Sequence, residues 1–95
     1  MLNDYTVLDL ETTGLDPKKE KIIEIGAARI RQGEVTEVYQ NMIQPGRELT
    51  ERVIGLTGIT DEMLSGKPYI GEILTEFLDF LGEDVLVGHR VLFDY

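Results

Sequence analysis

Asp9 and Glu11 are the two side chains of this sequence whose type and spacing first suggest chemistry. They stand one residue apart in the segment 5–14, which reads Tyr-Thr-Val-Leu-Asp-Leu-Glu-Thr-Thr-Gly. Because side chains alternate between the two faces of a β-strand, both carboxylates are predicted on one face, one pleat apart. Two carboxylates this close repel each other and lose hydration at the end of a covered strand. A divalent cation such as Mg²⁺ offsets both effects because it prefers oxygen ligands.

The surroundings of the pair decide whether it is a metal site or an ordinary pair of solvated acids. Most Asp-x-Glu pairs at strand ends are simply solvated. Here Val7, Leu8 and Leu10 supply apolar side chains to both faces, which predicts a central strand covered on both sides. The segment 12–14, Thr-Thr-Gly, then predicts a turn at the rim of the sheet, where backbone N–H groups and hydroxyls can meet a ligand. This setting favours the metal site.

The composition is that of one small globular domain. The chain has 95 residues, of which 42% are hydrophobic and 28% charged. It has no cysteine, which excludes a disulfide framework, a zinc–thiolate site and a cysteine nucleophile. The net charge of −9 argues against broad non-specific binding to duplex nucleic acid, but not against a site that holds phosphate through a bound metal. The N-terminus lacks secretory-signal features and no apolar run is long enough to span a membrane, so we expect a cytoplasmic protein with no membrane partner.

The pattern of apolar residues predicts an α/β fold around the first strand. Further strands are predicted at 22–30 and 35–43, joined by a hairpin that contains Gly33. Short connections make these three strands an antiparallel meander. The polar content of the third strand places it at an edge of the sheet.

The second half of the chain is predicted to be mainly helical. Short helices are expected at 50–54 and 60–64, with Thr50 and Thr60 as their N-caps and a turn at 55–59 between them. Apolar side chains at helical spacing predict the clearest helix, over residues 70–81 and ended by Gly82.

A fourth strand completes the predicted sheet. It is expected at 85–87, followed by a loop at 88–90 and the start of a further helix at 91–95. The helix before it lets this strand lie parallel to the first one through a right-handed crossover. The predicted architecture is therefore a mixed sheet, with three antiparallel strands and a fourth parallel to the first, flanked by helices.

Four stretches of the sequence resemble the DnaQ-like 3′–5′ exonucleases, the DEDD superfamily on a ribonuclease-H-like fold. They are residues 8–14 for the first motif, 22–27 for the second strand, 56–60 for a short helical turn and 87–94 for the second motif. They cover essentially the whole chain in the family's order, and are similar to the exonucleases of bacterial DNA polymerase III. The resemblance implies hydrolysis at a single-stranded 3′ end, with DNA favoured, a proofreading or repair role, and a DNA polymerase as a partner.

The resemblance also implies roles for individual residues. Asp9, Glu11 and Asp94 would be the catalytic metal ligands, holding two Mg²⁺ or Mn²⁺ ions that activate water and stabilise the leaving 3′ oxygen. The terminal nucleotide would be bound by Thr12, Thr13, Gly14 and Leu15. The alternatives are plain turn chemistry for the segment 12–15 and an ordinary surface acid for Asp94.

Two departures from the family pattern matter. Arg90 stands where the second motif commonly has Asn, and we assign it no role. The third motif, which supplies a general-base His or a Tyr and the fourth Asp, would lie beyond Tyr95, and His89 belongs to the second motif rather than to that base. We therefore expect residues 1–95 to be the N-terminal portion of an exonuclease domain. Alone, this chain is expected to have little or no nuclease activity and to self-associate through uncovered apolar surface.

Two other functions stay open at the level of sequence. One is a non-catalytic nucleic-acid-binding or scaffold domain with an incomplete site. The other is an oligoribonuclease-type enzyme that acts on short RNA. Metal-dependent release of nucleotides from a 3′ end separates an enzyme from a scaffold, and DNA against RNA oligomers separates the two enzymes.

Overall fold

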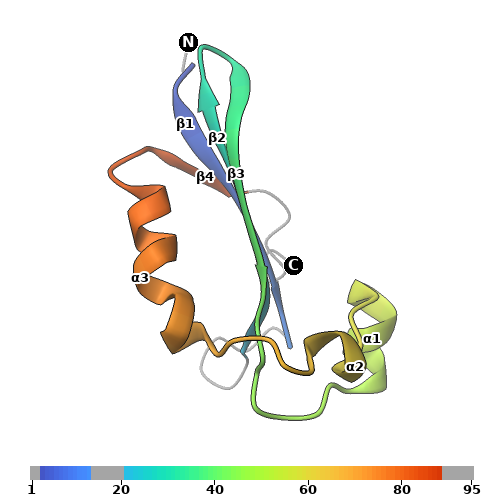
Figure 1. The fold of residues 1–95 in the computed structure, drawn as a ribbon. Coiled ribbons are helices and arrows are strands. Elements are labelled where there is room, and N and C mark those ends of the chain that lie inside the picture. The colour runs from blue at the N-terminus through green and yellow to red at the C-terminus, as the bar shows by residue number, and fades with distance from the viewer. Residues whose placement is uncertain (1–2, 14–20, 89–95) are drawn as a thin grey trace.

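A four-stranded mixed sheet forms the centre of the computed structural model, which describes residues 3–13 and 21–88 (Figure 1). Its strands are β1 (Tyr5–Thr12), β2 (Ile22–Arg31), β3 (Glu34–Met42) and β4 (Leu86–Gly88). The spatial order is β3-β2-β1-β4. Strands β1 to β3 pair antiparallel, whereas β4 pairs parallel with β1. The predicted α/β architecture, the central position of β1 and the edge position of β3 are confirmed.

Three helices accompany the sheet: α1 (Glu51–Thr57), α2 (Asp61–Leu64) and α3 (Ile70–Leu81). The N-caps predicted for α1 and α2 are confirmed, because the hydroxyls of Thr50 and Thr60 each accept a backbone N–H at 3.2 Å. The bounds of α3 are those predicted. Among residues 3–13 and 21–88, no helix combines the length and hydrophobicity that a membrane crossing requires.

The predicted turn at 55–59 is wrong in part, because α1 continues through its first three residues. The glycine at position 55 suggested an early end, but one glycine costs a helix only about 1 kcal/mol. The hydroxyl of Thr57 donates to the carbonyl of Val53 at 2.8 Å, inside the last turn. The helix ends at Gly58, whose φ of 75° suits glycine, and whose N–H donates to the carbonyl of Ile54.

Smaller differences concern the strand ends. Strand β2 includes Arg31, and β3 begins and ends one residue before the predicted range of 35–43. Strand β4 begins and ends one residue after the predicted range of 85–87, so it includes Gly88, which was predicted as the start of a loop. Strand β1 includes Thr12, which was predicted as the start of a turn. The rest of that loop and the predicted helix at 91–95 lie outside the described residues.

Helix α3 covers one face of the sheet (Figure 1). Its buried side chains Ile73 and Phe77 pack with Ile25, Ala27 and Ile43. The end of the helix is fixed to β2 by one side chain. The guanidinium of Arg29 lies 4.4 Å from the centre of the Phe80 ring and donates to the Phe80 carbonyl.

Only part of the apolar stripe predicted for α3 is buried by the described residues. Ile70, Leu74 and Leu78 are 37%, 43% and 54% exposed. The apolar residues lie at helical spacing, as predicted, but the described residues do not cover all of them.

A second hydrophobic cluster lies at the end of the sheet where α1 and α2 pack (Figure 1). Its buried members are Ile23, Leu49, Val53, Ile59 and Leu64. Six of the eight residues of β1 are half-buried rather than fully buried. The described helices therefore leave the middle of β1 partly open.

Candidate active site on the face of β1 and β2

Asp9 and Glu11 lie on the sheet face opposite α3. Leu8 and Leu10 pack against the cluster under α3, so the residues that alternate with them point to the other face. In the ladder with β2, Asp9 is opposite Gly26 and Glu11 is opposite another acid, Glu24. The prediction that the two carboxylates share one face is confirmed.

Small side chains leave open space on the surface of the sheet beside Asp9. An open hollow of about 240 Å³ lies over this face, and its lining includes Asp9, Gly26, Ala28, Val38 and Gln40. Glycine and alanine at the centre of this row leave space that larger side chains would fill. The hollow is therefore a surface where a ligand could approach Asp9.

One oxygen of Asp9 has no partner in the described structure. Its Oδ1 atom is buried and accepts no hydrogen bond. Leaving a buried acceptor unpaired costs about 1–3 kcal/mol, and more for a charged group, so this oxygen needs an explanation. Carboxylate oxygens are the donors that Mg²⁺ and Mn²⁺ prefer. The donor set of Asp9 and Glu11 thus fits a divalent cation, which would satisfy the unpaired oxygen.

The third predicted ligand, Asp94, lies outside the described residues. Within residues 3–13 and 21–88, no group of three or more Asp, Glu, His or Cys side chains is arranged to hold a metal ion. The start of the second motif does reach the site, because Gly88 of β4 pairs with Leu8, the neighbour of Asp9. His89 and Arg90 also lie outside the description.

Thr13, two residues after Glu11, has a structural role. Thr12 and Thr13 are 2% and 9% exposed. The N–H of Thr13 donates to the carbonyl of Lys21 at 2.8 Å, and its hydroxyl accepts the Lys21 N–H at 2.9 Å. Thr13 therefore joins the two ends of the segment 14–20, which agrees with the turn-chemistry alternative. Nucleotide binding by these threonines stays a prediction, as it does for Gly14 and Leu15, which lie outside the described residues.

Sequence reasoning missed Glu24 and Gln40 as members of this face. The amide nitrogen Nε2 of Gln40 donates to Oε2 of Glu24 at 3.0 Å. Gln40 is opposite Gly26 in the ladder of β2 and β3, and Gly26 is opposite Asp9. Glu24 stood in the stretch that resembles the family's second strand, but its place opposite Glu11 depends on strand register.

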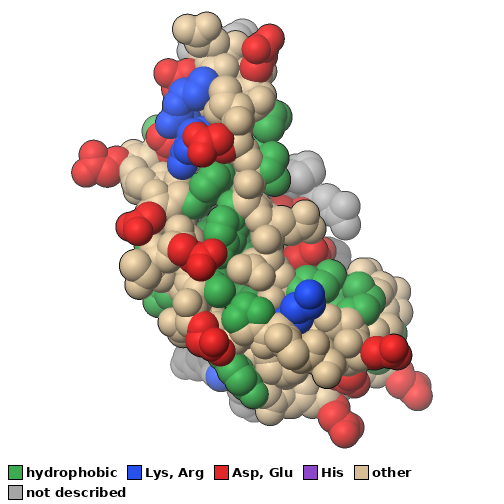
Figure 2. All heavy atoms as spheres, in the orientation of Figure 1, with side chains coloured by type: hydrophobic (Ala, Val, Ile, Leu, Met, Phe, Trp, Pro, Cys, Tyr) green, Lys and Arg blue, Asp and Glu red, His purple; other side chains and the backbone are tan. Residues whose placement is uncertain are grey.

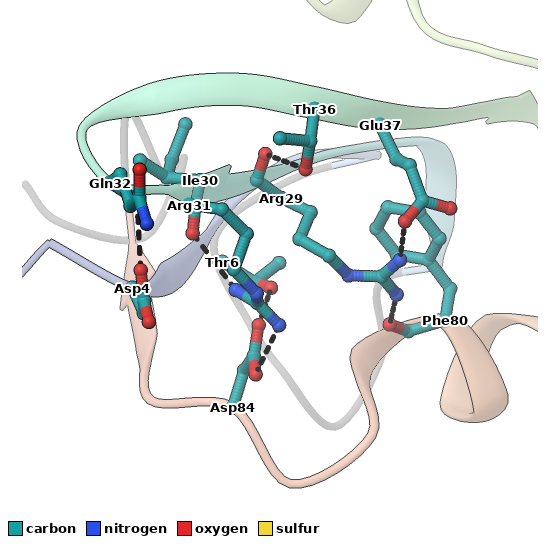
Figure 3. Close-up of polar contacts among 10 residues, drawn as sticks. All are labelled: Asp4, Thr6, Arg29, Ile30, Arg31, Gln32, Thr36, Glu37, Phe80 and Asp84. Carbon is teal, nitrogen blue, oxygen red and sulfur yellow. Dashed lines mark hydrogen bonds and ion pairs between the residues drawn. The ribbon is translucent and has the colours of Figure 1, made fainter.

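A contrasting acid, Asp84, lies near the other end of β1 (Figure 3). Its carboxylate accepts Arg31 Nη2 at 2.9 Å and the hydroxyl of Thr6 at 2.7 Å. These two hydrogen bonds, that of Arg31 being the larger effect, lower the pKa of Asp84 below its ordinary value. The Thr6 N–H also donates to the carbonyl of Val85 at 2.9 Å. This group of contacts attaches the connection between α3 and β4 to β1.

Acidic side chains predominate on the face of the molecule that Figure 2 shows. In the view of Figure 2, acidic side chains spread along the molecule and basic ones form a few separate groups. No continuous basic strip crosses the described part of this view.

The sequence of this chain is similar to those of known exonuclease and DNA polymerase III proteins. A family model described as Exonuclease matches residues 6–95. The PolC-type DNA polymerase III of Thermotoga petrophila is 50% identical over 91 residues, which cover 96% of this chain and 7% of that protein. The DNA polymerase III subunit epsilon of Aquifex aeolicus is 45% identical over 87 residues, which cover 92% of this chain and 43% of the subunit. The chain thus spans less than half the length of either relative.

Solved structures share the fold. Exonuclease X in complex with 5′ overhanging duplex DNA superposes with a TM-score of 0.76 at 25% identity, covering 94% of this chain and 50% of that one. A product-bound exonuclease I gives a TM-score of 0.78 at 16% identity, covering 95% of this chain and 22% of that one. The resemblance to the DnaQ-like exonucleases is confirmed in both sequence and fold. The chain belongs to the exonuclease family.

Proposed function

We propose that this chain is part of a metal-dependent 3′–5′ exonuclease that hydrolyses phosphodiester bonds at the 3′ end of DNA. The observation that carries the proposal is the buried, unpaired Oδ1 of Asp9, two residues before Glu11 on the central strand of an exonuclease-family chain. A carboxylate that ligates a metal is expected to have an oxygen without a hydrogen-bond partner when the metal is absent. An acid retained for stability would have hydrogen-bond partners.

Asp9 and Glu11, with Asp94 as the third carboxylate, would hold Mg²⁺ or Mn²⁺. When bound, such ions supply a water nucleophile of lowered pKa and neutralise charge on the leaving 3′ oxygen. The chain's own residues concentrate negative charge on one sheet face and keep the space beside it open. Thr12, Thr13, Gly14 and Leu15 would bind the terminal nucleotide next to this face.

The relatives support DNA as the substrate. Two of them are named as DNA polymerase III proteins, and one structural neighbour is described in complex with DNA. A proofreading or repair role, association with a DNA polymerase and a cytoplasmic location follow as predictions for this chain. The net charge of −9 agrees with phosphate bound through a cation rather than through a basic surface.

The test is a nuclease assay on the gene product that carries this sequence. With Mg²⁺ or Mn²⁺, it should shorten a 5′-labelled single-stranded DNA one nucleotide at a time from the 3′ end, and EDTA should stop it. Glu11→Gln should abolish the activity, whereas Asp79→Asn, at an exposed acid of α3, should not. No release of nucleotides with either metal would favour a scaffold. Faster cleavage of short RNA than of DNA would favour an oligoribonuclease-type enzyme.

A further inference from the structure

Glu24 faces Glu11 directly across the ladder between β1 and β2. In an antiparallel pair, side chains directly opposite each other have Cβ atoms about 4.5–5.5 Å apart, and two like charges there are destabilising. The neighbouring pair is Asp9 and Gly26, so no side chain from β2 separates Asp9 from these acids. The sheet therefore places three carboxylates on adjacent positions of one face.

The only described hydrogen-bond partner of Glu24 keeps its carboxylate in place without cancelling its charge. Gln40 is neutral, and its amide donates to Glu24 at 3.0 Å. In the part of the chain that the structure describes, the two ion pairs join Arg29 to Glu37 and Arg31 to Asp84, away from Glu24. An acid that is held in position but left with its charge can act on a cation nearby.

We propose that Glu24 is a positioning residue of the metal site, which raises the affinity of Asp9 and Glu11 for a divalent cation through its charge. The proposal rests on the proposed function, since it requires a metal at Asp9. Glu24 does not join Asp9 and Glu11 in a three-ligand group, so it acts at longer range. The negative charge of Glu24 attracts a cation that is held by Asp9 and Glu11, and this attraction strengthens binding.

The test compares Mn²⁺ binding in the 95-residue chain and its Glu24→Gln variant. The variant should bind Mn²⁺ about three- to tenfold more weakly, as expected for one charge several ångströms away. The difference in affinity should shrink in 0.5 M salt, because the interaction of the charges is screened.

Two control variants separate charge from structure. Glu24→Asp keeps the charge and should bind Mn²⁺ almost as tightly as the wild type. Glu34→Gln removes one charge from an exposed position at the hairpin end of β3 and should change nothing.

Each possible result decides something. Equal Mn²⁺ affinity in the wild type and Glu24→Gln would overturn the role of Glu24 and leave the metal site standing. A difference in Mn²⁺ affinity that is the same in 0.5 M salt would also overturn it, because an effect of charge is screened by salt. A wild-type chain that binds no Mn²⁺ would overturn both this inference and the metal dependence of the proposed function.

Discussion

Two aspartates beside β1 show how the same side chain serves two purposes. Near the start of the strand, Asp84 accepts hydrogen bonds from Arg31 and from the fully buried Thr6 (Figure 3). In the middle of the strand, Asp9 has a buried oxygen that accepts no hydrogen bond from the described residues. The carboxylate of Asp84 thus has hydrogen-bond partners within the fold, whereas Oδ1 of Asp9 has none among the described residues.

This difference in hydrogen bonding indicates which of the two acids has a functional role. A carboxylate with an arginine and a hydroxyl as partners stabilises the fold when it is charged, and its lowered pKa reflects that. A carboxylate without partners costs free energy in the same fold. The family resemblance assigns a role to Asp9 and none to Asp84, and the hydrogen bonds supply a physical reason for that contrast.

The largest expected effect is on catalysis. In the gene product that carries this sequence, Asp9→Ala should reduce 3′-end hydrolysis by about a thousandfold or more, because a metal ligand supplies several kcal/mol of transition-state stabilisation. Asp94→Ala should have the same effect. The circular-dichroism spectrum should be unchanged in both variants. Unchanged nuclease rates would show that these acids do not serve the reaction.

The second effect is on metal binding. Calorimetric titration of the 95-residue chain with Mn²⁺ should give a binding isotherm that Asp9→Ala/Glu11→Ala loses. Asp84→Asn should leave the isotherm intact, because that carboxylate already has its partners. Loss of binding in Asp84→Asn, with the double variant unaffected, would reverse the comparison.

The third effect concerns the 95-residue chain by itself. It should release little or no nucleotide from a 3′-labelled oligomer, and light scattering should show association. The exposed Leu74 and Leu78 of α3 are the apolar surface that motivates the second expectation. A monodisperse monomer with robust activity that depends on Asp9 would contradict both expectations.

The fourth effect is a difference of sign in stability. Without metal, Asp9→Asn should raise Tm by a few degrees, because it removes the charge of a carboxylate whose buried Oδ1 accepts no hydrogen bond from the described residues. Thr6→Val should lower Tm by about 5 °C, because it takes a hydrogen bond from a charged acceptor. Thermal unfolding followed by circular dichroism measures both. Changes of the same sign would remove the distinction between the two aspartates.

The smallest effect is on acid stability. The pKa of Asp84 is lower in the folded chain than its ordinary value of 3.8, so its contribution is present above that value and is lost as the pH falls through the folded pKa. Asp84→Asn should therefore lower stability at pH 6 more than at pH 2. Denaturant unfolding at the two pH values is the measurement, and an equal loss at both would show that the charge of Asp84 contributes nothing.

Much of this fold could be predicted because its signals are local. The alternation of apolar residues identified the strands, and the helical stripe identified α3 with its bounds. Thr50 and Thr60 were recognisable as N-caps because a cap acts on residues two or three positions away. The shared face of Asp9 and Glu11 followed from the period of a strand, and needed no knowledge of any other element.

The sequence by itself determined the order of the elements, the faces of β1 and the two acids that begin the site. Only the tertiary structure decided that Glu24 lies opposite Glu11 in the sheet. It also decided that Arg31 donates a hydrogen bond to Asp84, and that Oδ1 of Asp9 is buried without a hydrogen-bond partner among the described residues. The physical reason is the distance along the chain over which each interaction acts. Periodicity and capping act over a few residues of one segment, whereas strand register and the pairing of distant side chains depend on how all segments pack together.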